Sequence, residues 1–180
     1  IHGLNEQFHR VYGIEDAEGK HIVVERYVQD GRLTEAFNFN LDSLNVMDHM
    51  VVNALGENEK ATLYKDQFLP KLKGDTAKFI SKFSGVTDST VFLMEVNREL
   101  SAKKIRKVLS DSLECITLEE NAIYTLLNPF TKQESQQTLE TVAYFAKDIG
   151  LVMWYDTKKR SQFELEEILS QEKWIKLISE

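Results

Sequence analysis

Residues 126–156, LLNPFTKQESQQTLETVAYFAKDIGLVMWYD, constrain the fold more than any other stretch of the chain. Their pattern predicts a strand, a turn, a helix over residues 132–149 and a second strand. Thr131 and Glu134 have the spacing of a capping box at a helix start, and Gly150 stands where a helix would end. Because strands joined by a crossover helix are usually parallel, this stretch predicts a βαβ unit.

The turn of this unit does not resemble a phosphate-binding loop. It holds Asn128, Pro129 and Phe130, where such a loop needs glycines, and the chain has no nucleotide-binding glycine motif elsewhere. The four histidines form no zinc-binding motif, and no serine lies in a nucleophile elbow. The sequence therefore predicts no nucleotide cofactor, and no motif supports an enzyme.

Length and composition predict one domain, with room for a protruding sub-part, in a chain of 180 residues. A net charge of −7 argues against nucleic-acid binding by bulk charge, but not against a protein that gathers its bases on one face. No apolar run is long enough to span a membrane. Cys115 is the lone cysteine, which fits a reducing, cytoplasmic location. The chain begins at Ile1, so residues missing from the N-terminus are one expectation.

Apolar spacing predicts several further helices. In residues 43–55 the apolar positions recur every three or four residues and Gly56 follows them, as at a helix end. Residues 60–113 are expected to be mostly helical, with a helix capped by Ser101, although residues 90–97 fit either a strand or a helix. Another helix is expected over residues 162–171. Strands are expected at 32–40, 114–120 and 121–128, and residues 173–179 fit either element.

Basic side chains gather in the predicted helix over residues 101–113. Presented on one face, they could contact a phosphate backbone without reading sequence, although a solvated helix face explains them equally simply. No aromatic residue is interleaved with them, so stacking on single-stranded bases is not indicated. The candidate DNA-binding residues are Lys103, Lys104, Arg106, Lys107, Lys78 and Lys82.

The order of elements resembles the Csn accessory proteins of type II-A CRISPR systems. The similarity lies in RLTEAFNFNLDSLNVMDHMVVNALGENEKATLYKDQFLPKL, in VFLMEVNREL with KKIRKVLSDSLECITLEE, and in AIYTLLNPFTKQESQQTLETVAYFAKDIGLVMWYD. It covers most of residues 32–180 and is one of pattern rather than of an invariant motif. The chain departs from the family by lacking a helix between Glu120 and Asn121.

The resemblance implies an α/β fold, a degenerate P-loop ATPase-like head with parallel βαβ units. Residues 1–60 and 114–180 would form this head, and residues 61–113 a helical leg. It further implies a non-catalytic homotetrameric ring around double-stranded DNA ends, stabilised by calcium, that assists the CRISPR integrase and effector nuclease in spacer acquisition. Glu95 and Glu99 are the nearest matches to the family's calcium-binding segment, although this region is less acidic here.

A second interpretation is an α+β ferredoxin-like domain. Residues 90–156 can be divided as βαββαβ, an order shared by many ligand-sensing and regulatory domains. The state of residues 90–97 separates the two interpretations, because this stretch is a strand in the ferredoxin-like fold and a helix in the Csn family.

Overall fold

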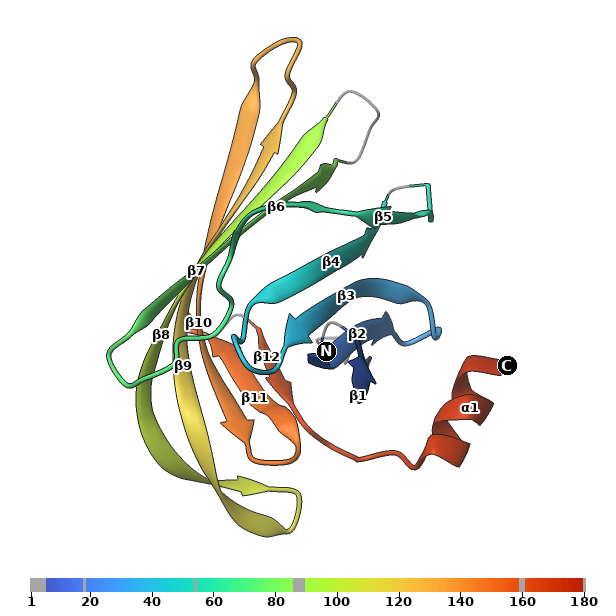
Figure 1. Cartoon of the computed structure of the whole chain (residues 1–180), viewed down its shortest axis with the longest axis vertical. Coiled ribbons are helices and arrows are strands. Elements are labelled where there is room, and N and C mark those ends of the chain that lie inside the picture. Colours follow the sequence, from blue (N-terminus) through green and yellow to red (C-terminus); the bar gives the residue numbers. More distant parts are fainter. Residues whose placement is uncertain (1–5, 18, 54, 86–89, 159–160, 180) are drawn as a thin grey trace.

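The computed structural model describes residues 6–17, 19–53, 55–85, 90–158 and 161–179, which form two antiparallel sheets and one helix (Figure 1). The first sheet has five strands in chain order: β1 (Gln7–Asp16), β2 (Gly19–Val28), β3 (Leu33–Asn40), β4 (Val46–Val52) and β5 (Asn58–Lys60). The second has seven, also neighbouring in chain order: β6 (Thr62–Asp66), β7 (Thr76–Ser84), β8 (Val91–Val108), β9 (Asp111–Leu127), β10 (Glu134–Ala146), β11 (Gly150–Asp156) and β12 (Gln162–Glu164). Helix α1 (Gln171–Ser179) follows.

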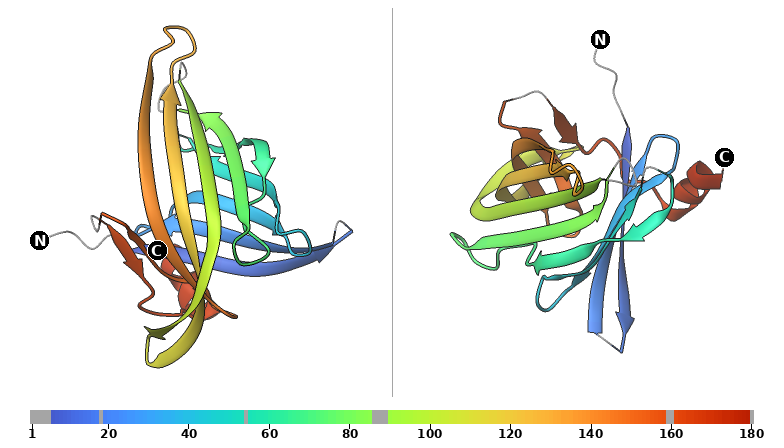
Figure 2. Two further views of the ribbon diagram at one scale, coloured as in Figure 1. Left: turned by 90° about the vertical axis from the view of Figure 1, so that its left-hand side faces the viewer. Right: turned by 90° about the horizontal axis from the view of Figure 1, so that it is seen from above.

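The two sheets face each other, and their strands cross at a steep angle (Figure 2). The ends of β9 and β10 that meet at the 128–133 turn extend beyond the five-stranded sheet (Figure 1). Helix α1 packs on the outer face of β1 and β2, which points away from the seven-stranded sheet. There the Trp174 ring is 4.8 Å from the Tyr27 ring and 6.1 Å from the Phe8 ring.

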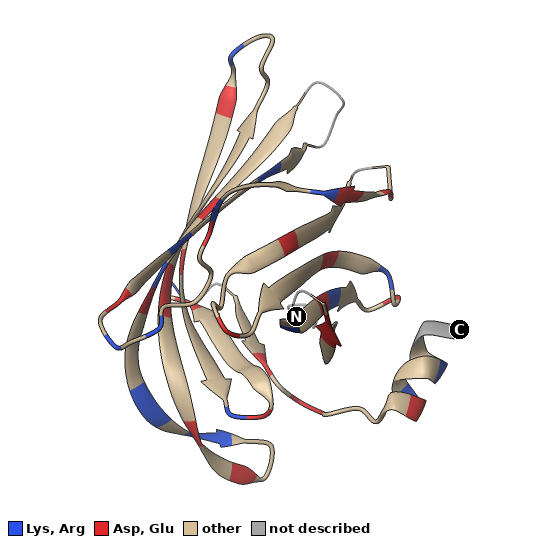
Figure 3. Cartoon of the chain, viewed as in Figure 1, with Lys and Arg blue, Asp and Glu red and all other residues tan. Residues whose placement is uncertain are grey.

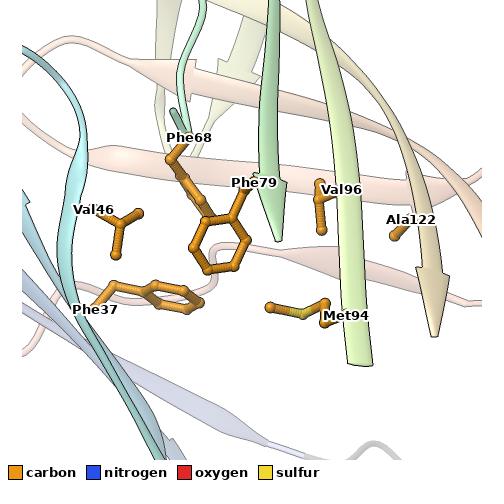
Figure 4. Close-up of a cluster of buried hydrophobic side chains, with 7 residues drawn as sticks. All are labelled: Phe37, Val46, Phe68, Phe79, Met94, Val96 and Ala122. Atoms are coloured by element: carbon orange, nitrogen blue, oxygen red, sulfur yellow. The ribbon is translucent and has the colours of Figure 1, made fainter. Parts of the chain in front are cut away.

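The main hydrophobic core fills the space between the sheets (Figure 4). Phe68 joins the two sides, because its ring centre is 5.1 Å from that of Phe37 on β3 and 5.3 Å from that of Phe79 on β7. Burying apolar side chains from both sheets stabilises their packing. The buried members are Phe37, Val46, Phe68, Phe79, Met94, Val96 and Ala122.

A second core lies on the other face of the seven-stranded sheet. The hairpin end of β8 and β9 curls over the lower part of β10 and β11 (Figure 1) and buries Val108, Cys115, Tyr144, Ala146 and Val152. The second half of β10 therefore has protein on both faces.

The predicted βαβ unit is wrong. Residues 134–146 form β10, which pairs antiparallel with both β9 and β11. Asn128 closes the first turn, since its Oδ1 accepts hydrogen bonds from the amides of Phe130 and Thr131, at 3.0 and 3.1 Å. The misleading apolar spacing of residues 139–149 has a physical cause: a strand buried on both faces loses the alternation that identifies strands.

The other predicted helices are also strands, so the P-loop ATPase-like head and the ferredoxin-like alternative are both wrong. Residues 46–52 form β4, and the expected helical leg at 61–113 consists of β6, β7, β8 and the start of β9. Residues 101–113 form a hairpin that turns at Leu109, with φ of 54°. Residues 162–171 contain a short strand instead of a helix.

Several sequence-based predictions are confirmed. Residues 33–40 and 150–156 form strands, and residues 90–97, left open, lie largely in β8. The two strands expected over 114–128 form one continuous strand, β9, in which Glu120 and Asn121 are consecutive. The C-terminal segment, left open between strand and helix, is α1.

Candidate functional site

Polar and charged side chains, most of them largely buried, lie beside the apolar core between the sheets. They come from β1, β2 and β3 on one side and from β8 and β9 on the other, and they face the main core. We call this set the inter-sheet cluster: His9, Arg26, Glu35, Arg98, Glu120 and Tyr124.

Glu35 on β3 is the centre of the first half of the cluster. Its carboxylate accepts a hydrogen bond from Arg26 at 2.7 Å and contacts the His49 ring Nε2 at 2.9 Å. Burial alone would raise the pKa of Glu35, but Arg26 and His49 outweigh it and hold this pKa below its ordinary value. Glu35 is therefore a carboxylate at neutral pH.

His49 connects Glu35 to the opposite sheet. Its Nδ1 lies 2.6 Å from Oγ of Ser81 on β7, so Ser81, His49 and Glu35 form a chain like that of nucleophilic hydrolases. However, His49 and Ser81 are each 0% exposed, which leaves no path for a substrate to the serine oxygen. This hydrogen-bonded series therefore connects β3, β4 and β7 and does not expose a nucleophile to a substrate.

The second half of the cluster is an ion pair within the seven-stranded sheet. Arg98 on β8 donates to Glu120 on β9 at 2.6 Å and to the Phe68 carbonyl at 3.1 Å. Its guanidinium carbon also lies 3.5 Å from the centre of the Phe68 ring. These contacts compensate the desolvation of a nearly buried pair, whose side chains are 11% and 16% exposed.

Tyr124 and His9 complete the cluster. Burial, followed by the charges of Glu120 and Glu35, raises the pKa of Tyr124, so its hydroxyl is protonated at neutral pH. The His9 ring stacks on Phe163 of β12, with centroids 5.1 Å apart. Burial, assisted by Arg26, lowers the pKa of His9 to about 4, so this ring is neutral at pH 7.

An apolar groove adjoins the cluster on the inner face of β8, β9 and β10. It is a shallow, open groove with a volume of about 380 Å³. Tyr124 belongs to both features, since it lines the groove and interacts electrostatically with Arg26 and Arg98. The lining residues are Phe92, Tyr124, Leu126, Ser135, Gln137 and Leu139.

The structure separates the six candidate DNA-binding residues. Lys103 and Lys107 project from one face of β8, and Lys104 and Arg106 from the other, because strand side chains alternate. Arg106 donates to the Tyr144 hydroxyl at 2.5 Å, in the second core. On this curl the basic residues lie on β8 and the acidic residues on the neighbouring β9 (Figure 3).

The remaining two lysines, Lys78 and Lys82, lie four residues apart on the outer face of β7. Lys78 pairs with Glu95 at 2.8 Å, just as Lys103 pairs with Glu114 at 2.7 Å. Each ion pair neutralises a charge that the DNA-binding hypothesis assigns to phosphate.

The two candidate calcium ligands are not brought together. Glu95 and Glu99 lie on the same face of β8, four residues and therefore about 13 Å apart. Glu99 stands opposite Glu119 in the strand register. Within residues 6–179, leaving aside positions not described, no three acidic, histidine or cysteine side chains gather as a metal site would require.

Sequence reasoning missed the inter-sheet cluster because its members are far apart in the chain, and because residues 90–97 were left open between a strand and a helix. A signal was present in the strand period of two. Arg98 follows Met94 and Val96 at alternate positions, and Glu120 precedes Ala122 and Tyr124 in the same way. A charge in an alternating apolar row indicates a buried polar site once the row is assigned to a strand.

Comparisons of the chain with protein-family models, curated proteins and solved structures give no match. The resemblance to Csn accessory proteins therefore remains a pattern in the sequence, and the fold that it implied is contradicted. In the part of the chain that the structure describes, no helix has the length and apolar character needed to cross a membrane.

Proposed function

We propose that this protein binds a small apolar or amphipathic molecule in the groove between Phe92 and Leu139 and does not transform it. The observation that carries the proposal is the position of Tyr124, where an apolar groove meets buried charged groups. Ligand sites commonly combine an apolar lining with a few fixed polar groups that orient the ligand.

The groove has the apolar character of the core but is less completely covered. Phe79, Met94 and Ala122 lie on the same inner face and are nearly inaccessible to solvent. Phe92 and Leu139 pack against them yet remain only partly buried. Apolar surface left open beside a core favours the binding of a partner or ligand.

This proposal agrees in function with the ligand-sensing alternative from the sequence, although the ferredoxin-like fold expected with it is wrong. The DNA-end-binding hypothesis rests on the Csn resemblance and stays a separate prediction. Lys103 and Lys104 lie on opposite faces of β8, and Lys103 is paired with Glu114, so these lysines do not form one basic surface. This arrangement supports DNA binding less than the groove supports a small ligand.

The experiment uses N-phenyl-1-naphthylamine, an uncharged probe that fluoresces in apolar sites. We expect the unmodified protein to enhance its fluorescence and Gln137→Trp to reduce the affinity at least tenfold, because an indole at this exposed groove position would cover Tyr124. Thr138→Trp, on the opposite face of the same strand, is the matched control and should bind like the unmodified protein.

Absence of probe binding to the folded protein would contradict the proposal. Equal losses in the two tryptophan variants would contradict it as well, since they would place the probe outside the groove. Circular dichroism of each variant establishes that the strands are intact before affinities are compared.

A further inference from the structure

Strand β1 forms an open edge of the five-stranded sheet. In the part of the chain that the structure describes, it pairs with β2 and with no other strand. The start of β1 is covered, because Phe8 contacts α1 on the outer face and His9 contacts β12 on the inner face. Residues 10–16 continue past both elements, and all of them except Tyr12 are exposed. The end of the β1–β2 hairpin projects away from the seven-stranded sheet (Figure 2).

An exposed strand edge of this kind is a template for a further strand. Because only alternate residues of β1 bond to β2 through the backbone, the others direct their N–H and C=O groups away from the sheet. A strand added to β1 satisfies these groups and covers the side chains of Val11 and Ile14, which are 51% and 41% exposed. The edge is therefore suited to binding an extended protein segment.

The side chains of residues 10–16 favour a second copy of this chain as the partner. Two copies that join edge to edge about a two-fold axis run antiparallel, and residues opposite each other share a face of the sheet. Since faces alternate along a strand, the axis passes through a residue and not between two residues. An axis at Gly13 sets Arg10 opposite Asp16 of the second copy.

Charge pairing selects this axis over its alternatives. Arg10 is the one basic residue in the segment 10–16, and among axes at these positions the one at Gly13 alone sets Arg10 opposite a carboxylate. An axis at Arg10, Glu15 or Asp16 would set a charge opposite its own copy, which is destabilising.

Both charged side chains are accessible to a partner. Arg10 donates to Glu25 at 3.2 Å and is 44% exposed, and Asp16 contacts the His21 ring at 3.0 Å and is 51% exposed. A guanidinium has about five N–H donors and a carboxylate about four acceptor sites, so each can serve more than one partner.

The remaining contacts of this arrangement are compatible with the fold. Tyr12 lies opposite Ile14 of the second copy on the outer face, an aromatic–aliphatic pair beside the ion pair. Phe8 and His9 have no residue of the second β1 opposite them, since that strand ends at Asp16. The parts of the strand that contact α1 and β12 therefore stay outside the pairing.

We propose that residues 10–16 of β1 are a self-association surface, through which two copies of this chain pair antiparallel about an axis at Gly13. The five-stranded sheet of one copy then continues into that of the other. Because one short strand segment makes a contact smaller than a standard interface, the dimer is weak and reversible, with a micromolar dissociation constant. β1 contributes no residue to the groove, so this inference does not depend on the proposed ligand.

Disulfide trapping tests the position of the axis. Gly13→Cys places two thiols where opposite Cα atoms are about 4.5–5.5 Å apart, within the range of a disulfide. Outside its own chain neighbours, the added Cβ meets the His21 carbonyl oxygen at 3.9 Å, and the native Cys115 is fully buried. In a glutathione redox buffer at about 0.1 mM protein, well above a micromolar dissociation constant, we expect a covalent dimer on non-reducing electrophoresis.

Val11→Cys is the matched control, since Val11 is exposed on the same face of β1 as Gly13. The proposed axis separates the two Val11 positions by about 13 Å, so this variant should give at least tenfold less covalent dimer. An equal mixture of Val11→Cys and Glu15→Cys should cross-link again, because these two positions lie opposite each other.

A charge exchange tests the ion pair by sedimentation velocity. Arg10→Asp sets two carboxylates opposite each other and should weaken the dimer about tenfold. The double variant Arg10→Asp/Asp16→Arg restores opposite charges and should recover the dimer. Circular dichroism establishes that each variant is folded.

Three results would overturn the proposal: a Gly13→Cys variant that stays monomeric, equal cross-linking of Gly13→Cys and Val11→Cys, or a double charge variant no better than Arg10→Asp. Binding of N-phenyl-1-naphthylamine should be the same in the monomer and the dimer. Self-association and ligand binding can therefore fail independently of each other.

Discussion

The ion pair between Arg98 and Glu120 provides a quantitative test of the fold. Replacing Arg98 with Met leaves the Glu120 carboxylate, 16% exposed, without its cation. Removing one partner of a buried pair typically costs about 3–5 kcal/mol, so we expect Arg98→Met to lower the free energy of unfolding by about 4 kcal/mol. Glu120→Leu should cost about 3 kcal/mol, because Arg98 keeps the carbonyl and the ring of Phe68.

The double variant Arg98→Met/Glu120→Leu should be much more stable than the sum of the two losses. With both charges replaced by apolar side chains, nothing ionic remains buried, and such replacements are often neutral or stabilising. We expect the double variant to lie within about 1 kcal/mol of the unmodified protein. The coupling energy is then at least about 6 kcal/mol, far above that of an exposed pair.

Urea unfolding, followed by circular dichroism and tryptophan fluorescence, measures these free energies. The control is the same pair of substitutions at Lys103 and Glu114, whose ion pair has side chains 66% and 63% exposed. Each control variant should change the stability by less than about 1 kcal/mol. A double variant as unstable as the sum of the Arg98 and Glu120 losses would refute the reasoning, as would single variants close to the unmodified protein.

Three further predictions concern the same network and the basic residues. Glu35→Gln should lower the free energy of unfolding by about 2 kcal/mol at pH 7. The folded state lowers the pKa of Glu35, so its carboxylate stabilises the fold at neutral pH, and this stabilisation is lost as the pH falls below about 4.5 and the carboxylate is protonated. The urea midpoints of the two proteins, measured from pH 7 to pH 3, should therefore converge at low pH. Ser81→Ala leaves a buried nitrogen of His49 without its hydrogen-bond partner, so it should lower the free energy of unfolding by about 1–3 kcal/mol. Ser84→Ala, at an exposed position of the same strand, is the control and should have little effect in the same urea assay. If the DNA-binding hypothesis holds, reversing three positive charges should weaken binding to linear duplex DNA and flatten the salt dependence of that binding. Fluorescence anisotropy with and without calcium measures both effects. If the unmodified protein binds no duplex in either condition, the DNA-binding hypothesis is rejected. The reversed residues are Lys103, Lys104 and Lys107.

The candidate site was hidden from the sequence because burial is a property of two sheets together. Arg98 and Glu120 are separated by 21 intervening residues, and they meet only because β8 and β9 pair in one register. Likewise, Glu35 and Ser81 reach the same His49 ring from different sheets. No local spacing encodes such meetings, whereas the basic cluster at 103–107 was conspicuous because its members are neighbours in the chain.

Local chemistry along the chain is enough to place many of the turns. Gly31, with φ of 77°, lies in the turn that joins β2 to β3, and the predicted turn at 128–130 joins β9 to β10. A turn depends on the backbone freedom and side-chain hydrogen bonds of a few consecutive residues, which the sequence displays directly. The strands at 33–40 and 150–156 are visible for a similar reason, since their β-branched and aromatic residues favour extended structure.

Whether the segment between two turns forms a helix or a strand depends on its tertiary contacts. Residues 139–146 carry apolar side chains at helical spacing, but they lie between the two hydrophobic cores and pair with β9 and, from Thr141 onward, also with β11. A central strand that is buried on both faces can place apolar residues at any position, so its sequence is compatible with both a helix and a strand. Pairing with β9 and β11 satisfies its backbone hydrogen bonds and sets its state, a long-range effect absent from the segment's own residues.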